Sequence, residues 1–125
     1  MSDTSIVEMP TRWMLGRIHR ATITRRRIGL VRRLVIDAEL LRRAGLAHLR
    51  EVEVTAMDRP ATATFRLVAG PSGSHEICLR DLPTGRFRVG DRLVICGYAA
   101  AGDQVPIRPR LLVLGPHNIV LSAST

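Results

Sequence analysis

Two side chains of this chain could exchange a proton with a small molecule. His19 carries an imidazole, which titrates near neutral pH, and Tyr98 is the only tyrosine and follows the strongest predicted strand. Either could act as a general acid or base if the fold places it beside a ligand. The alternatives are a hydrogen-bonded structural group for His19, which the pattern favours, and a barrel-end residue for Tyr98.

Positive charge is carried by arginine alone. All 19 basic residues are Arg, against 11 acidic residues, and the formal net charge is +8. Guanidinium groups fork onto carboxylates and phosphates, so an anionic ligand is one interpretation. The other interpretation, which we favour, is that arginine replaces lysine throughout and forms an ordinary solvated protein surface. The lack of lysine excludes Schiff-base chemistry on a side-chain amine, and with it ordinary pyridoxal phosphate catalysis.

Other constellations of reactive residues are weak. His75 and Cys78 lie three apart in a predicted strand, so their side chains should face opposite sides and we expect no shared metal ion. No Ser-His-Asp order or glycine-rich phosphate loop is recognised. One Trp, one Tyr and two Phe are too few for stacking bases, and no recognition helix is apparent, so nucleic acid binding is not expected.

The composition indicates one compact domain. With 125 residues, 46% of them apolar, the chain can bury a single core. Its uncharged apolar runs are only a few residues long, so none should span a membrane, and the first residues lack the order of a signal peptide. We expect a cytoplasmic protein in which Cys78 and Cys96 are reduced core residues.

One short helix is predicted. Asp37 is placed to cap a helix over residues 38–44, whose apolar residues share one side. Gly45 then ends the helix at the position that favours a left-handed residue.

The rest of the pattern predicts short strands and turns. Alternating apolar and β-branched residues indicate the strands, and Gly and Pro clusters separate them. They cover residues 17–24, 51–55, 61–68, 75–79, 93–96, 111–114 and 119–121, with shorter apolar pieces at 28–31 and 34–36. The run Arg25-Arg26-Arg27 is interpreted as a solvated turn or strand end. Many short strands with little helix favour a small closed β-barrel.

A set of motifs relates the chain to a known family. The opening stretch carries Gly16, His19, Arg20, Thr24, Ile36 and Asp37 in order, and further motifs follow at 72–75, 89–91 and 108–109. In these residues, over positions 14–120, the chain resembles aspartate 1-decarboxylase, which makes β-alanine from aspartate. The resemblance implies a six-stranded double-psi β-barrel with one or two short helices, usually a tetramer with active sites between subunits. We expect a flexible tail at 1–12, the barrel at 13–121 and a C-terminal tail at 122–125.

The family's self-processing site is altered. Family members cut a Gly-Ser bond in themselves and turn the Ser into a pyruvoyl group, and this chain carries Arg32-Arg33 at that position. Between Arg25 and Asp37 there is no Ser, Thr or Cys to attack the preceding carbonyl, and arginine cannot do so. We predict an uncleaved chain without pyruvoyl or any other cofactor.

The resemblance also assigns pocket positions. The family's Lys corresponds to Arg17, its Asn to Arg80 and its substrate-carboxylate Arg to Ala61. Its Thr is retained as Thr64, and its Tyr proton donor becomes Phe65. We expect a substrate pocket lined by Arg17, Thr64, Phe65 and Arg80, whose two arginines could hold an anion. The alternative is that both arginines form structural pairs with acidic residues across a subunit contact.

These positions lead to a functional hypothesis. The sequence predicts a pyruvoyl-independent enzyme that acts on a small metabolite, by isomerisation, dehydration or cyclisation, in a specialised biosynthetic pathway. His19 and Tyr98 would move protons, and the loss of electrophile and acid would exclude aspartate decarboxylation. The alternative is a non-catalytic assembly partner or a ligand-binding regulatory protein. We expect a homo-oligomer, a tetramer by resemblance, with a small-molecule substrate, no metal and no membrane partner.

Overall fold

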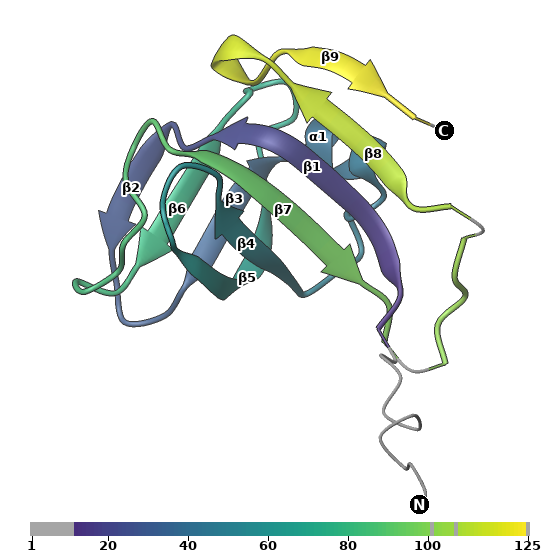
Figure 1. Ribbon diagram of the computed structural model, residues 1–125, viewed down its shortest axis with the longest axis horizontal. Helices are drawn as coiled ribbons and strands as arrows, with labels where there is room; N and C mark the ends of the chain where they lie inside the picture. The colour runs from purple at the N-terminus through teal and green to yellow at the C-terminus, as the bar shows by residue number, and fades with distance from the viewer. Residues whose placement is uncertain (1–11, 101, 107, 125) are drawn as a thin grey trace, which may run out of the picture.

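The computed structural model describes residues 12–100, 102–106 and 108–124 of the chain. This part holds nine strands, one α-helix and one 3-10 turn (Figure 1). In chain order they are β1 (Met14–Thr22), β2 (Arg25–Ile28), β3 (Arg33–Asp37), α1 (Ala38–Ala44), β4 (Glu51–Ala56), β5 (Thr62–Gly70), β6 (Ile77–Asp81), β7 (Arg92–Tyr98), β8 (Arg110–Leu114), η2 (Pro116–Asn118) and β9 (Val120–Ala123).

The strands form one curled sheet in the order β2-β6-β3-β5-β4-β7-β1-β8-β9. Most neighbours are antiparallel, whereas β1–β8, β2–β6 and β3–β5 are parallel. Helix α1 contacts β8 and β3, and Figure 1 shows it behind the sheet beside β1 and β8. Within the described residues, no helix is long and apolar enough to cross a bilayer.

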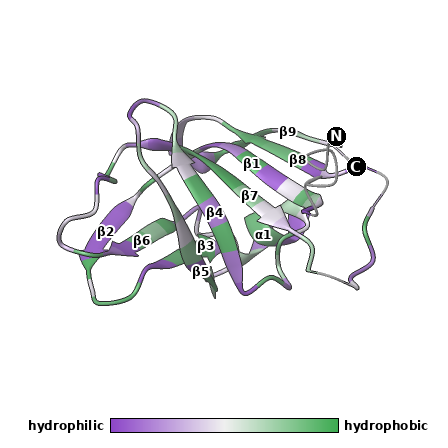
Figure 2. Ribbon diagram, turned by 60° about the horizontal axis from the view of Figure 1, so that its bottom comes forward, coloured by the Kyte–Doolittle hydropathy of each residue, from purple (hydrophilic) through white to green (hydrophobic). Residues whose placement is uncertain are grey.

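The core follows from the two-residue period of the strands. In β7 buried and half-buried positions alternate strictly, and the same alternation runs through β4, so apolar side chains collect on the inner, concave face. Figure 2 shows this alternation in β4, whereas β2 is hydrophilic along most of its length. The largest fully buried side chains include Ile18, Leu34, Ile36, Phe65, Leu79 and Ile95. Phe65 meets Phe87 edge to face, with ring centroids 5.5 Å apart.

The predicted helix is confirmed at both ends. The Asp37 carboxylate caps α1 by accepting a hydrogen bond from the Glu39 backbone N–H at 2.8 Å. Gly45 ends it with a φ of 73°, in the left-handed region. Gly16 lies against the last turn, where a Cβ would collide with the carbonyl oxygen of Ala44. β1 can therefore approach the helix closely only because it carries glycine there.

Two predictions about the strands need correction. The mainly β fold is confirmed, but six strands in a double-psi arrangement are not, because the described residues form nine strands. The interpretation of Arg25-Arg26-Arg27 as a turn or strand end is wrong: these residues are β2, paired in parallel with β6 from Arg25 opposite Cys78. Backbone pairing explains the difference, since the ladder uses N–H and C=O groups and leaves charged side chains free to face solvent.

The Asp37 carboxylate joins three segments. Besides Glu39, it accepts hydrogen bonds from the backbone N–H groups of Gly73 at 2.9 Å and His75 at 2.8 Å, although only 1% of the residue is exposed. Burial alone would raise the pKa of Asp37, but these three N–H groups together lower it below its ordinary value. One carboxylate thus ties the β3–α1 junction to the loop before β6.

We expect Asp37→Asn to lower the free energy of unfolding by about 1–3 kcal/mol, because its amide would turn a donor toward a backbone N–H. The depressed pKa of Asp37 contributes stability that is present above about pH 4 and lost as the pH falls through the folded-state pKa. The stability of the wild type should therefore fall more steeply on acidification than that of Asp37→Asn. Urea melts at several pH values measure both effects.

The exposed Asp103, which accepts one backbone hydrogen bond from Ala100, offers a matched control. Asp103→Asn should change stability by less than about 0.5 kcal/mol. Equal acid sensitivity of the wild type and Asp37→Asn would contradict the role given to Asp37.

Candidate functional site

A row of polar side chains crosses the outer, convex face of the sheet. Arg17 on β1 lies opposite Cys96 on β7, Cys96 lies opposite Glu53 on β4, and Glu53 lies opposite Thr64 on β5. Residues directly opposite each other in a sheet project to the same side. The pairing register therefore brings together four groups that are far apart in the sequence.

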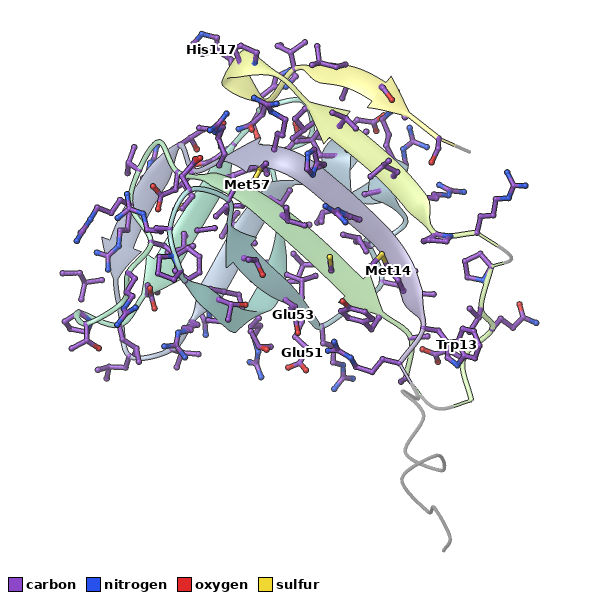
Figure 3. The ribbon with its side chains drawn as sticks, viewed as in Figure 1. Trp13, Met14, Glu51, Glu53, Met57 and His117 are labelled. Atoms are coloured by element: carbon purple, nitrogen blue, oxygen red, sulfur yellow. The ribbon has the colours of Figure 1, made fainter. Side chains whose placement is uncertain are left out.

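A cavity of about 660 Å³ opens over β4, β5 and β7 along this row. Its polar lining comes from Arg12, His48, Arg50, Glu51, Glu53, Thr64, Arg66, Cys96, Tyr98 and Asp103. Figure 3 shows Glu51 and Glu53 close together at the start of β4. Three arginines and three acids thus share one hollow, which suits a ligand that carries charges of both signs.

Arg12 closes one side of the cavity. Its Nη1 atom donates a hydrogen bond to the Glu53 carboxylate at 3.1 Å, and its guanidinium carbon lies 3.9 Å from the Tyr98 ring centroid. The ion pair and the cation–π contact hold the arginine over the ring. Both partners are partly exposed, so the pair is open to exchange with a ligand.

Tyr98 and Cys96 stay protonated in this environment. Burial raises the pKa of the Tyr98 phenol, and the neighbouring Cys96 thiol and Glu53 add to the rise. Burial also raises the pKa of Cys96, which the positive charge of Arg17 partly offsets. At neutral pH Tyr98 is therefore a neutral hydroxyl that can donate a hydrogen bond or a proton.

Arg17 and His19 lie together in a second hollow, of about 590 Å³, lined also by Met14, Arg110 and Leu111. Arg17 Nη2 lies 3.3 Å from His19 Nδ1, and because a guanidinium only donates, Nδ1 must accept and Nε2 must carry the ring proton. Burial lowers the pKa of His19, and the charges of Arg17 and Arg20 lower it further. The imidazole is therefore neutral at pH 7.

Removing the nearest positive charge should raise the pKa of His19. We expect Arg17→Gln to move it up toward, but not fully to, about 6.5, because burial remains. An NMR titration of the imidazole protons measures this shift. Arg110→Gln, in the same hollow, serves as the control, and an equal shift in both variants would contradict the Arg17–His19 contact.

Four of the six predicted site residues line one of the two hollows, and two do not. Thr64 and Tyr98 line the larger cavity, and Arg17 and His19 line the smaller hollow. Phe65 lies in the core with no exposed surface, so it does not reach the cavity lined by Thr64. Arg80 is exposed on β6, opposite Arg33, and lines neither hollow.

Sequence reasoning missed most of the cavity. Arg12, Arg50, Glu53 and Cys96 line it, yet none belongs to a recognisable motif. Alternation in β4 indicates that Glu51 and Glu53 share a face, but only the sheet order places β4 between β5 and β7. In the described residues no group of three or more His, Cys, Asp or Glu side chains could hold a metal ion.

The self-processing position of the resembled family can be tested against the residues present. Arg32 donates from Nε to the buried Asp81 carboxylate at 3.1 Å, and Arg33 is exposed on β3. The nearest preceding hydroxyl, that of Thr24, is engaged with the backbone of Ile77 as donor at 3.1 Å and as acceptor at 3.0 Å. These residues do not fit a pyruvoyl group formed between Arg25 and Asp37.

We therefore expect the purified protein to be a single intact chain. Denaturing mass spectrometry should give one species of 13.8 kDa. Two fragments that together account for this mass would contradict the expectation and would locate a cleavage site elsewhere. An Arg33→Ser variant tests whether a hydroxyl at the same position is sufficient for cleavage.

The fold and the site define a mainly β protein whose curled sheet presents a charged cavity between neighbouring strands. The profile of the aspartate decarboxylase family matches residues 9–121. The chain belongs to the aspartate decarboxylase family, which confirms the resemblance seen in its motifs.

Relatives match over most of both chains. An aspartate 1-decarboxylase of Carboxydothermus hydrogenoformans is 34% identical over 110 residues, which are 86% of this chain and 87% of that one. The corresponding protein of Pseudomonas fluorescens is 28% identical over 111 residues, 87% and 88% of the two chains. That of Bacillus subtilis is 28% identical over 107 residues, 84% of each.

This relationship corrects the functional hypothesis drawn from the sequence. The prediction of an isomerase, dehydratase or cyclase in a specialised pathway, with aspartate decarboxylation excluded, is wrong. The family profile and the relatives all point to aspartate decarboxylases, and no relative named here carries another activity. The arginines at positions 32 and 33 argue against formation of a pyruvoyl group at that place. They do not identify a different reaction.

Proposed function

We propose that this protein recognises an amino acid of the aspartate class, a molecule with two carboxylates and one ammonium group, in the 660 Å³ cavity over β4, β5 and β7. The observation that carries the proposal is that arginines and glutamates share this one hollow in a member of the aspartate decarboxylase family. The relatives' names supply the substrate class.

The lining charges match such a ligand. Arg12, Arg50 and Arg66 provide guanidinium groups that can fork onto the two carboxylates. Glu51 and Glu53 provide the opposite charge for the ammonium group. A dicarboxylate without an amine would leave these glutamates uncompensated, so the cavity should prefer the amino acid.

Hydroxyl groups complete the site. Thr64 lies opposite Glu53 and two residues before Arg66 on β5, where its hydroxyl can accept from an ammonium or donate to a carboxylate. Tyr98, kept protonated by its raised pKa, lies against the Arg12 guanidinium, where its hydroxyl can donate a hydrogen bond. In this site Tyr98 would donate a hydrogen bond to the bound molecule, and His19 would hold Arg17 in place at the neighbouring hollow.

Recognition and loss of carbon dioxide make different demands on the site. Loss of a carboxylate as CO₂ leaves an electron pair on carbon that needs an electron-accepting group. The cavity residues supply binding charge and a proton but no such acceptor, so the proposal rests on recognition. Decarboxylation is measured in a separate assay, as release of CO₂ and β-alanine from aspartate.

We also infer that residues 13–121 form the body of a barrel domain, to which Arg12 and the end of β9 at Ser122 and Ala123 also belong, and that four copies assemble. Support comes from the family relationship and from large apolar side chains left exposed, among them Trp13 (62%), Leu30 (92%) and Leu121 (65%). Light scattering after gel filtration should give about four times 13.8 kDa. A monomer would overturn the assembly and would leave the cavity proposal standing.

Calorimetric titration with L-aspartate tests recognition. We expect binding in the roughly micromolar to millimolar range of metabolite sites, and about tenfold weaker binding by Arg50→Gln. Glu53→Gln should weaken aspartate binding but not succinate binding, because succinate lacks the ammonium group. Arg108→Gln, an exposed arginine outside this cavity, is the control for net charge and should change affinity by less than about twofold.

Two results would overturn the proposal. One is no heat from aspartate on a folded sample. The other is equal loss of affinity in Arg50→Gln and Arg108→Gln, which would mean attraction by net charge alone. Binding without release of CO₂ or β-alanine would support recognition and assign the chain no decarboxylase turnover of its own.

A further inference from the structure

Four arginines stand directly opposite one another on four neighbouring strands. Arg66 on β5 pairs with Arg33 on β3, Arg33 pairs with Arg80 on β6, and Arg80 pairs with Arg27 on β2. We call Arg66, Arg33, Arg80 and Arg27 the arginine row. None of these pairings contains a register shift, so the four Cα positions form one line across the sheet.

The arginine row lies on the outer face. Its members are all exposed, whereas the adjacent positions Leu34 and Leu79, which are also paired with each other, are fully buried in the core. Because side chains alternate along a strand, burial of these leucines forces the arginines outward. At the strand spacing of roughly 4.7–4.9 Å, each arginine is held beside another of the same charge.

Such a row opposes folding unless something compensates it, because like charges directly opposite are destabilising in a sheet. Other arginines of this region have acidic partners: Arg25 pairs with Glu76 and Arg32 with Asp81. Among the residues that the structure describes, no acid lies within ion-pair distance of the arginine row. Only Glu51, opposite Arg66 at one end, stands in line with it.

The stem of Arg80 packs against the backbone of Gly29, the residue that follows β2. A Cβ added to Gly29 would lie 2.5 Å from Arg80 Cδ and 2.7 Å from Arg80 Cγ, so the stem of Arg80 rests on this glycine. The Gly29 backbone N–H in turn donates to the carbonyl oxygen of Asp81 at 2.9 Å. The middle of the row is therefore positioned by packing, although the side chain is exposed.

We propose that the arginine row binds a compact anion with two or more phosphoryl groups. Four guanidinium groups in a line, with no acid among them, match a ligand that carries negative charge only, which excludes a zwitterionic amino acid. Guanidinium forks fit phosphate oxygens bidentately, and linked phosphates place several charges within the length of the row. This site goes beyond the proposed function, and only Arg66 also lines the amino-acid cavity.

Titration with inorganic tripolyphosphate tests this site. We expect saturable binding that weakens as salt rises, and about tenfold weaker binding by Arg33→Gln or Arg80→Gln. Arg108→Gln removes one exposed arginine elsewhere and should change affinity by less than about twofold. Gly29→Ala keeps every charge but displaces Arg80, and should also weaken binding several-fold.

Thermal melts without ligand distinguish a binding role from a structural one. Because the arginine row opposes folding, Arg33→Gln and Arg80→Gln should melt at or above the wild-type temperature. A large drop in both would overturn the proposal and assign the row a structural role. If either variant does not fold, Arg27→Gln on the edge strand β2 tests the same charge line.

Further comparisons name the ligand and separate this site from the amino-acid cavity. ADP in place of tripolyphosphate distinguishes a nucleotide from an inorganic source of the phosphoryl groups. Three results would each overturn the proposal. The first is equal affinity for citrate, and the second is tighter binding of a single-stranded oligonucleotide. The third is dissociation of subunits in the variants without any effect of tripolyphosphate. Aspartate binding should be unchanged in Arg80→Gln, so failure of one site leaves the other testable.

Discussion

The pairing register of β5 with β3 and β4 fixes which side chains enter the core and which charges meet on the outer face. Phe65 is buried between Thr64 and Arg66, which are both exposed. A slip of one residue would bring an arginine into the core and expose the phenylalanine, because side chains alternate with a period of two. The cost of burying an unpaired guanidinium group is large, so the core residues also determine which charges meet on the outer face.

The outer face then divides by charge. Toward β4 and β7, arginines and glutamates line the same cavity, and Arg12 and Glu53 form an ion pair there. Toward β6 and β2 the acids drop out, and the arginine row follows without interruption. Mixed charge suits a zwitterion, whereas uniform charge suits a polyanion, and the same sheet face presents both in adjoining regions.

The family profile and the residues at positions 32 and 33 answer different questions about this protein. The profile match over residues 9–121 reports that the whole chain is related to aspartate decarboxylases. Arg32 and Arg33, which the motif resemblance places at the family's cleavage position, show only that these two residues carry no hydroxyl. Those two residues do not define a new reaction class, because the absence of one chemical group does not specify another reaction.

The local features of this protein can be predicted from its amino-acid sequence. The capped helix after Asp37, most of the strands and the family motifs follow from residue type and spacing, because capping, alternation and turn chemistry act over a few residues. The sequence also placed Thr64 and Tyr98 among the candidate site residues. Which strands are neighbours is seen only in the folded chain. Backbone N–H and C=O groups are nearly the same for every residue type, so the sequence does not specify which strands pair. The order of the strands put Glu53 beside Thr64, aligned four arginines, made Arg25-Arg26-Arg27 a strand and left Phe65 in the core.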